Sequence, residues 1–317
     1  MKKILEELKA TDRIAISGHV RPDGDCIGSC MGLFLYLKKA LPGAEVEVYL
    51  EKPADIFSCI KGIEHVKTDC SADICYDVCI AVDTVSSRMG DAEKYFNTAK
   101  KTINIDHHIS NASGCGMVNY VNPQASSASE LVYELLEEEL IDEPIAKAIY
   151  IGMVHDTGVF QYSNTTPHTL EVAAKLISYG FDFSGLIDET FYEKTYVQNQ
   201  ILGRALLESI VFMDGKCIFS AIDKKTMDFY KVVPKDLDGI VSQLRTTRGV
   251  ECAIFMYQTG QQEYKVSLRS NGRVDVAKVA SYFGGGGHVR AAGCTMQGTY
   301  HDCINNLSLQ IERQLEA

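Results

Sequence analysis

In the first half of the chain, short apolar runs of strand length alternate with longer segments whose apolar residues recur at helical spacing. The short runs predict strands at 13–17, 45–50, 78–82 and 102–105. The longer segments predict helices at 26–41, 127–140 and 145–155. Strands and helices that alternate in this way are typical of an α/β domain with a mainly parallel sheet.

The second half of the chain predicts a further sheet with helices. Strands are expected at 216–222, 251–258 and 263–269, and helices at 234–246, 276–283 and 300–315. The last two strands are joined across Thr259, Gly260 and Gln261, which predicts a hairpin.

Together the two patterns predict an α/β protein of two domains. We expect a larger N-terminal parallel-sheet domain over 1–184, a helical linker over 185–202 and a smaller C-terminal α/β domain over 203–317. A cleft between the domains, closed by hinge motion of the linker, is then the expected place for a ligand.

The composition is that of a globular chain: 46% of its 317 residues are hydrophobic and 23% are charged, which excludes a disordered or collagen-like protein. The longest apolar runs are too short to span a membrane, and the N-terminal MKKILEELKATD is acidic where a signal peptide would be apolar. The 11 cysteines are odd in number and form no Cys-x-x-Cys pair, so we interpret them as reduced thiols, mostly in the core. A cytoplasmic location is therefore expected.

Charge is distributed unevenly along the chain. Residues 1–202 hold 17 basic and 30 acidic side chains, a net charge of −13, whereas residues 203–317 hold 14 basic and 12 acidic ones, a net charge of +2. The total of −11 argues against binding along a long nucleic acid, because such binding depends on neutralising phosphates with Lys and Arg. The two parts are therefore expected to have different electrostatic roles.

Carboxylates and imidazoles follow the carboxyl ends of three predicted strands and of one predicted helix. They are His19, Asp23 and Asp25 after the strand 13–17, Asp83 after 78–82, Asp106, His107 and His108 after 102–105, and Asp156 after the helix 145–155. Ligands of open parallel sheets bind beyond the carboxyl ends of the strands, so these residues predict one shared site. The alternative is local: Asp25 caps the helix that begins at Cys26, and Asp23 begins a turn.

Four of these carboxylates, those of Asp23, Asp25, Asp83 and Asp156, need cations if they share a pocket. Unit charges about 4 Å apart repel by about 4 kcal/mol at a moderate effective dielectric constant. Two divalent ions would cancel four carboxylates, and Asp83 is the natural bridge between them. Carboxylate and imidazole ligands together favour Mn²⁺, with Mg²⁺ or Co²⁺ as alternatives, over a thiolate-bound zinc ion.

A glycine run, Gly284–Gly287, stands before His288 and Arg290 in the second half. Successive backbone N–H groups in front of a helix would form a cradle for phosphate, and glycine lets an anion approach them closely. Arg269, at the end of a predicted strand, adds a cationic donor. The alternative interpretation is a flexible break after a helix.

In this order, the motifs resemble those of the DHH phosphoesterase superfamily. The matching residues are His19-x-x-x-Asp23-x-Asp25, Asp83, the triplet Asp106-His107-His108, and His155-Asp156. Ser267-Leu268-Arg269-Ser270 and Gly284-Gly285-Gly286-Gly287-His288 resemble the DHH-associated C-terminal domain. The resemblance spans the whole chain, and its length and layout are most similar to the bacterial nanoRNase and pAp-phosphatase group, called NrnA-like.

The resemblance implies roles for individual residues. One cation would be held by His19, Asp23 and Asp83, and the other by Asp25, Asp83, His107 and Asp156. His108 would contact the phosphate or orient a metal ligand, with Asp106 supporting it. Arg269, Gly286, Gly287 and His288 would bind substrate, and we add Arg290 because it is close to them in sequence.

The resemblance also implies an activity. Water activated between two cations would hydrolyse short oligoribonucleotides to mononucleotides and convert 3′-phosphoadenosine 5′-phosphate (pAp) to AMP. The expected partners are short RNA and nucleoside bisphosphates, with neither long nucleic acid nor a membrane, and the chain would be a monomer or a homodimer.

Three alternatives stay open at this point. A phosphodiesterase of linear or cyclic dinucleotides, such as pApA or cyclic di-AMP, would use the same residues. An aspartyl-phosphate phosphatase would need its acid directly after the strand, whereas Gly18–Pro22 intervene here. A non-catalytic nucleotide sensor would have lost metal ligands, and in this sequence none is missing.

Overall fold

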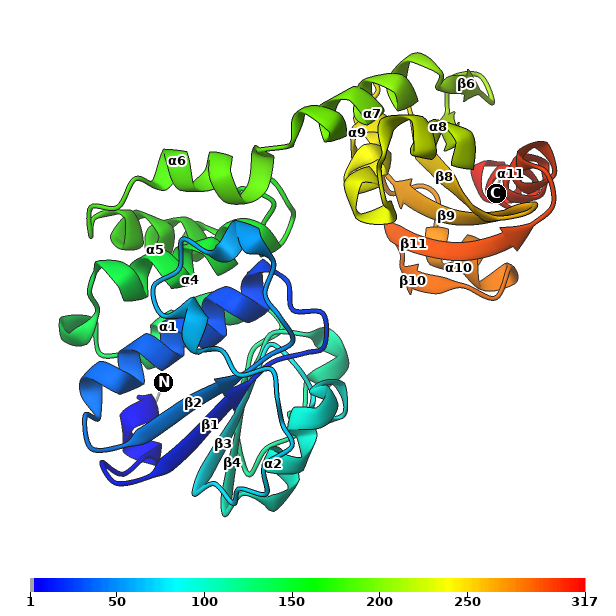
Figure 1. Ribbon diagram of the computed structural model, residues 1–317. Helices are drawn as coiled ribbons and strands as arrows, with labels where there is room; N and C mark the ends of the chain where they lie inside the picture. The colour runs from blue at the N-terminus through cyan, green and yellow to red at the C-terminus, as the bar shows by residue number, and fades with distance from the viewer. Residues whose placement is uncertain (1–2, 317) are drawn as a thin grey trace. The chain divides into compact units, whose positions relative to one another are not determined.

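The computed structural model describes residues 3–316, and the chain divides into two compact units, Met1–Glu193 and Lys194–Ala317 (Figure 1). The division falls inside the range 185–202 for which the sequence predicts a linker. That range contains the end of one short helix, a π-helical turn and the start of a longer helix.

The first unit is built on a five-stranded sheet with the strand order β2-β1-β3-β4-β5. Its strands are β1 (Arg13–Ser17), β2 (Glu45–Tyr49), β3 (Val78–Val82), β4 (Lys101–Asp106) and β5 (Val118–Val121). Every neighbouring pair runs parallel, which confirms the predicted sheet. The sequence did not indicate β5, because its four residues contain an asparagine and form no apolar run.

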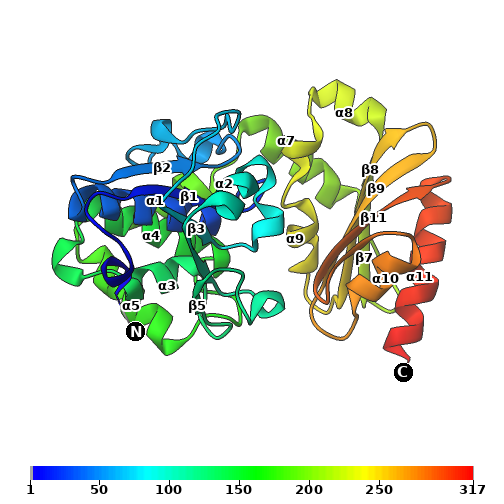
Figure 2. The ribbon, with the colours of Figure 1, turned by 90° about the horizontal axis from the view of Figure 1, so that it is seen from below.

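Helices cover both faces of this sheet (Figures 1 and 2). On one face, α1 (Gly24–Ala40), α3 (Ala128–Leu135) and α4 (Glu143–Asp156) share a hydrophobic cluster with the strands, and α5 (Pro167–Ile177) packs against α4. On the other face, α2 (Glu93–Thr98) packs with three tyrosines and with Met89. This burial on both sides explains why β3 is buried at every position.

The remaining helical elements of the first unit are short. They are α6 (Phe183–Ile187), the π-helical turn Asp188–Tyr192, and the 3₁₀ turns Ile4–Glu7, Asp55–Phe57, Ile63–His65, Ser86–Arg88, Gly90–Ala92, Ile109–Asn111 and Glu138–Leu140. The helix predicted over 127–140 therefore ends early, at Leu135. Continuing it would place three consecutive glutamates at the negative end of its dipole, which is unfavourable.

The second unit is built on a six-stranded mixed sheet with the order β10-β11-β9-β8-β7-β6. Its strands are β6 (Ile210–Phe212), β7 (Cys217–Ile222), β8 (Cys252–Gly260), β9 (Glu263–Ser270), β10 (Gly286–His288) and β11 (Ala291–Gln297). Only β7 and β8 pair in parallel. One face packs against α7 (Tyr196–Leu207), α8 (Lys224–Tyr230) and α9 (Ile240–Arg245), and the other against α10 (Val276–Tyr282) and α11 (Tyr300–Leu315) (Figure 2).

The strands β6, β10 and β11 and the helix α8 were not predicted, and two predicted features of this unit differ in detail. The helix predicted over 234–246 is broken into a 3₁₀ turn, Pro234–Leu237, and α9, because Gly239 between them has a left-handed φ of 88°. The hairpin between β8 and β9 turns at Gln261 and Gln262, one residue later than predicted. No helix within residues 3–316 is long and apolar enough to cross a membrane.

Close backbone contact between α1 and α4 fixes the geometry of the first unit. A Cβ atom built on Gly28 of α1 would lie 2.6 Å from the carbonyl oxygen of Ala148 and 2.6 Å from the backbone nitrogen of Gly152, both in α4. Such distances leave no room for a side chain, so glycine is required although it weakens a helix interior. The contact sets how close the two helices lie along their lengths.

We expect the substitution Gly28→Ala to destabilise the protein by about 1–3 kcal/mol, because the added methyl meets backbone atoms that cannot rotate away. Gly203→Ala is the matched control, since no atom lies within 4 Å of a Cβ at that position in α7, and it should be neutral or stabilise by up to about 1 kcal/mol. Denaturant unfolding of both variants measures the difference. Equal stability of the two would contradict this packing account.

Candidate metal centre

Six of the predicted ligands come together beyond the carboxyl ends of the parallel strands. β1 leads to His19, β3 to Asp83 and β4 to His107, while α1 and α4 supply carboxylates at one end each. All the ion-pair distances within this set fall between 3.5 and 3.8 Å. The set, called the acidic centre below, consists of His19, Asp23, Asp25, Asp83, His107 and Asp156.

Asp83 lies in the middle of the acidic centre. Its Oδ2 is 3.5 Å from Nε2 of His19, and its Oδ1 is 3.5 Å from Nε2 of His107 and 3.6 Å from Nδ1 of His108. The residue is 2% exposed, and its Oδ1 has no hydrogen-bond partner among the described residues. A buried carboxylate oxygen without a partner is costly, so this atom points to a bound cation.

The backbone at Asp83 is also unusual. Its φ of 57° is left-handed, a conformation that costs energy for a residue with a side chain, although aspartate tolerates it better than most. Its N–H donates to the carbonyl oxygen of Ile105, at 2.8 Å, which ties the turn after β3 to β4. The strained turn aims the carboxylate between the imidazoles of His19 and His107.

His107 is surrounded by three carboxylates. Its Nε2 lies 3.8 Å from Oδ2 of Asp25, 3.5 Å from Oδ1 of Asp83 and 3.6 Å from Oδ2 of Asp156. These residues come from α1, β3 and α4, so tertiary folding alone brings them together. Asn164 donates to Oδ2 of Asp156 at 3.3 Å and to the carbonyl oxygen of Ser126 at 2.8 Å, which holds the Asp156 side chain in place.

Asp25 is held by the amino end of α3. The backbone N–H groups of Ala128 and Ser129 donate to its two carboxylate oxygens at 2.7 and 2.9 Å. The helix N-terminus stabilises this negative charge, which is 2% exposed. The local alternative for Asp25 is therefore wrong: Asp23, whose Oδ1 accepts from the N–H groups of Asp25 and Cys26, caps α1.

A hydrogen-bonded network supports His108 from behind. Its Nδ1 lies 2.7 Å from Oδ1 of Asp106, and Asn111 donates to the other oxygen of Asp106 at 2.6 Å and to Oδ1 of Asn104 at 2.8 Å. Asp106 and Asn104 are fully buried. Neither asparagine was predicted to belong to the site, although an Asn between two isoleucines in the buried strand β4 was a usable signal.

The carboxylates and imidazoles shift each other's pKa values. Burial opposes the charged form of His19, but hydrogen bonds to Asp23 and Asp83 outweigh it and raise its pKa to about 11. Burial likewise opposes the charged form of His107, whose neighbours Asp83, Asp25 and Asp156 raise its pKa to about 10. Burial, together with the charges of Asp83 and Asp156, raises the pKa of Asp25 well above its ordinary value.

The residues of the acidic centre could hold a metal ion. An ion with bonds of about 2.1 Å separates its ligand atoms by roughly 3 to 4 Å, which matches the distances of 3.5 to 3.8 Å here. Asp83 belongs to two groups of residues that could surround an ion, one that includes His19 and one that includes His107. Asp25, His107 and Asp156 form a third such group. The donor set of carboxylate oxygen and imidazole nitrogen fits a divalent cation.

A further group, Glu130, Glu134 and His168, could also surround an ion. Its polar atoms already have partners: Oε2 of Glu130 accepts from Ser126 and Thr169, and Nε2 of His168 lies 2.8 Å from Oε1 of Glu134. These contacts account for the group without a cation.

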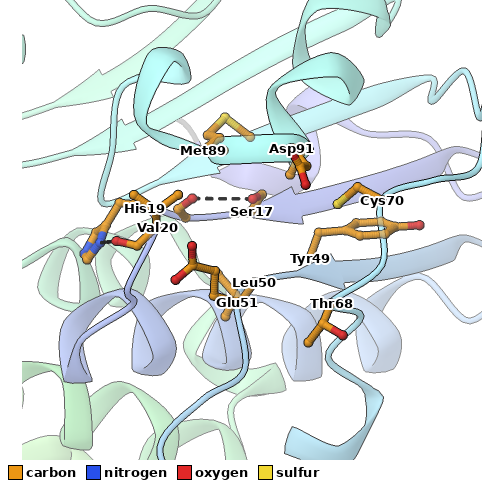
Figure 3. A pocket seen from close by; sticks show the side chains of 13 residues that line it. Ser17, His19, Val20, Tyr49, Leu50, Glu51, Thr68, Cys70, Met89 and Asp91 are labelled. Atoms are coloured by element: carbon orange, nitrogen blue, oxygen red, sulfur yellow. Dashed lines mark hydrogen bonds between the residues drawn. The ribbon is translucent and has the colours of Figure 1, made fainter. Parts of the chain in front are cut away.

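A cavity of about 160 Å³ adjoins the acidic centre beside β1 and β2. Figure 3 shows His19 at one end of this cavity and Tyr49 and Cys70 at the other. Of the acidic centre, only His19 lines it. Its lining includes Glu51 and Asp91, whose charges disfavour a phosphate there.

In the second unit, Arg269 and His288 lie on one face of the sheet. Val266 and Leu268 of β9 are buried with α10 and α11, so the alternating side chain of Arg269 points to the opposite face. Arg269 pairs in register with Ala291 of β11, and Ala291 pairs with His288 of β10. Paired residues share a face, so the Cα atoms of Arg269 and His288 are about 10 Å apart in one row.

The glycine run does not lead into a helix, which corrects the predicted cradle. Gly286–His288 instead form β10, an edge strand that pairs with β11. A Cβ on Gly285 or Gly287 would lie 2.2 or 2.5 Å from a carbonyl oxygen of β11, so packing requires glycine at both positions. At Gly286, no atom lies within 4 Å of a Cβ. The fold therefore leaves open space at Gly286, on the face that carries His288.

Arg290 lies in the turn between β10 and β11. The Arg290 side chain is exposed and lies close to Gly272: a Cβ atom built on that glycine would be 3.6 Å from Nη2 of Arg290. Its side chain thus extends past the end of β9, beside the loop that leads to α10.

Comparison with known proteins shows what the chain is similar to. The family model described as the N-terminal domain of the DHH family matches residues 13–153, and the DHHA1 domain matches residues 214–317. The bifunctional oligoribonuclease and PAP phosphatase NrnA of Thermus thermophilus is 31% identical over 100% of this chain and 93% of its own length. The protein of the same name from Bacillus subtilis is 28% identical over 93% of this chain and 92% of its own. A solved structure of an exopolyphosphatase-related protein from Bacteroides fragilis has a TM-score of 0.86 at 25% identity, covering 95% of this chain and 92% of that one.

Divalent cation binding should weaken as the pH falls through about 6. Burial and the charges of Asp83 and Asp23 raise the pKa of Asp156 to about 6, so below that pH its carboxyl is protonated and unavailable as a ligand. Near neutral pH, binding should release protons, because His19 and His107 hold them in the metal-free protein. Calorimetric titration with Mn²⁺, in buffers of different ionisation enthalpy, measures both effects. His168→Ala changes a residue outside the acidic centre, so the pH dependence of Mn²⁺ binding and the proton release should stay as in the wild type. Mn²⁺ affinity that does not change with pH would contradict the role of these carboxylates and imidazoles as ligands.

Proposed function

This chain belongs to the DHH family, and we propose that it is a two-metal phosphohydrolase that degrades short oligoribonucleotides to mononucleotides and converts pAp to AMP. The observation that carries the proposal is Asp83, a buried carboxylate with an unpartnered oxygen between His19 and His107. The names of the relatives from Thermus thermophilus and Bacillus subtilis support the choice of substrates.

In this proposal the two cations have separate ligands that share Asp83. His19, Asp23 and Asp83 hold one, and Asp25, Asp83, His107 and Asp156 hold the other. Mn²⁺ is the proposed ion, with Mg²⁺ or Co²⁺ as substitutes, because the ligands mix carboxylates with imidazoles. The distances of 3.5 to 3.8 Å around Asp83 and His107 support this division.

The bound ions would supply an acidified water and neutralise charge on the phosphate. The side chains of the chain have the other tasks. Asp83 fixes the spacing of the centre, and Asp106 holds His108 through Nδ1, which leaves Nε2 to donate to a phosphate oxygen. The pKa of His108 is raised, first by its hydrogen bond to Asp106, which favours the charged form of the ring and thereby an anionic substrate.

The second unit would bind the rest of the substrate. Arg269 and His288, in one row of the sheet, supply cationic donors, and the open space at Gly286 lets the nucleotide approach the backbone. Gly287, which packs against β11, would contribute its backbone only. Arg290 adds charge at the end of the row. The net charge of −11 limits the chain to short nucleotides, since a long polyanion would be repelled by the acidic half.

A substrate panel tests the activity. With added Mn²⁺, kcat/KM should be highest for pAp and RNA dinucleotides, with AMP and mononucleotides as products, and lower for pApA and cyclic di-AMP. Asp83→Asn keeps the size of the side chain but removes the shared charge, so turnover should fall by at least about 10³-fold. Highest kcat/KM on cyclic di-AMP or pApA would move the assignment to dinucleotides. Nucleotide binding without turnover would favour a sensor, and normal activity of Asp83→Asn would contradict the two-metal proposal.

A second experiment tests the substrate face. Arg269→Ala should raise KM for pAp by about tenfold or more, because a charge-assisted hydrogen bond is lost, while Mn²⁺ binding stays unchanged. Lys265→Ala is the matched control: it removes the same charge from the same face of β9, four residues earlier, and should change KM much less. Equal effects of the two variants would mean that general charge, rather than a contact at Arg269, governs binding.

A further inference from the structure

The thiol of Cys26 belongs to one of the groups that could hold an ion. Ligand atoms of His19, Cys26 and Asp83 all lie within 4.8 Å of one another, and all three residues are buried. Cys26 is fully buried, at the start of α1 and directly after Asp25. A sulfur atom therefore lies beside the acidic centre, on its His19 side.

The position of this sulfur is fixed by the surrounding backbone. A Cβ built on Gly18 would lie 2.1 Å from Sγ of Cys26, so the thiol packs directly against the chain between β1 and His19. The backbone N–H of Cys26 donates to Oδ1 of Asp23 at 3.1 Å, which ties the same residue to the loop. In this position Sγ lies within reach of His19 and Asp83.

A cysteine ligand would change which cations bind most tightly on the His19 side of the acidic centre. Oxygen and nitrogen donors suit Mn²⁺ and Mg²⁺, whereas a thiolate selects thiophilic ions such as Zn²⁺ and Cd²⁺. Thiolate sulfur, imidazole nitrogen and carboxylate oxygen are all zinc ligands, and zinc sites are mostly four-coordinate. As such an ion binds, the thiol proton leaves to water and the sulfur–metal bond forms.

We infer that Cys26, together with His19 and Asp83, binds a thiophilic divalent cation in place of Mn²⁺ on the His19 side of the acidic centre. The inference rests on the proposed metal centre but not on its substrate. Zn²⁺ or Cd²⁺ bound there occupies Asp83 and competes with the activating ion, so both should act as inhibitors.

Two other buried cysteines serve for comparison. Cys30 lies one turn further along α1 than Cys26, and Cys79 lies in the cluster on the opposite face of the sheet. Both are fully buried, and neither belongs to an ion-binding group among the described residues. A role common to all buried thiols would make the three equivalent.

Titration of the metal-free full chain with Cd²⁺ tests the inference. Wild-type protein should show thiolate-to-Cd²⁺ charge-transfer absorption in the ultraviolet, which Mn²⁺ in excess should reduce. Cys26→Ala should lose that absorption and bind Cd²⁺ more weakly by about tenfold or more, with Mn²⁺ affinity changed by less than about threefold. Cys79→Ala, which leaves a comparable cavity, should behave as wild type, and Cys26→Ser provides a second variant of nearly the same size.

The outcomes separate this inference from the proposed function. Absorption that is unchanged in Cys26→Ala and Cys26→Ser would overturn the inference, as would Cd²⁺ that competes with Mn²⁺ but shows no thiolate absorption. A third outcome would also overturn the inference: the absorption disappears in both Cys26→Ala and Cys30→Ala, and excess Mn²⁺ does not reduce it in the wild type. Cd²⁺ would then be bound by a pair of cysteines outside the acidic centre. In each of these cases, Mn²⁺ binding and hydrolysis would still support the proposed function.

Discussion

The concentration of negative charge around Asp83 is the constraint on which the rest of the first unit depends. Asp25 and Asp83 are each 2% exposed, and unit charges about 4 Å apart repel by about 4 kcal/mol even at an effective dielectric constant near 20. The chain offsets part of this repulsion with two protonated imidazoles and with the amino end of α3. What is left, an unpartnered oxygen on Asp83, is the part that a cation would neutralise.

Several features that weaken a fold elsewhere are explained by this constraint. Glycines inside α1 and α4 let the two helices touch, and a Cβ on Gly152 would lie 2.9 Å from Oδ1 of Asp25 and still closer to Ser129. Asp83 has a left-handed φ of 57°, and Asn104 is fully buried in the middle of a strand. Local rules of helix, strand and core are broken together where the carboxylates meet, as is typical of functional sites.

The sequence predicted the parallel sheet and the residues that gather at its edge because both depend on patterns of short range. An apolar run that is followed by Asp or His predicts both a strand and a candidate metal-binding residue at the end of that strand. Examples are β3 with Asp83 and β4 with His107. It could not predict that Asp25 is bound by the N–H groups of Ala128 and Ser129, since that contact joins residues more than a hundred positions apart. The edge strand β10 was also missed, because glycine has low strand propensity and β10 forms only where β11 pairs with it.

The two sides of Asp83 differ in chemistry, and this asymmetry follows from the fold. On one side His107 faces three carboxylates, those of Asp25, Asp83 and Asp156, so the donors are hard and strongly negative. On the other side His19 faces two carboxylates and has the thiol of Cys26 within reach. Helix α1 generates this difference, because Asp25 and Cys26 are adjacent on it and their side chains point about 100° apart around the helix axis. Consecutive residues of one helical turn therefore lie on opposite sides of one carboxylate. In the inferred site, a substitution at position 26 would change the cation preference of the His19 side and leave the His107 side intact.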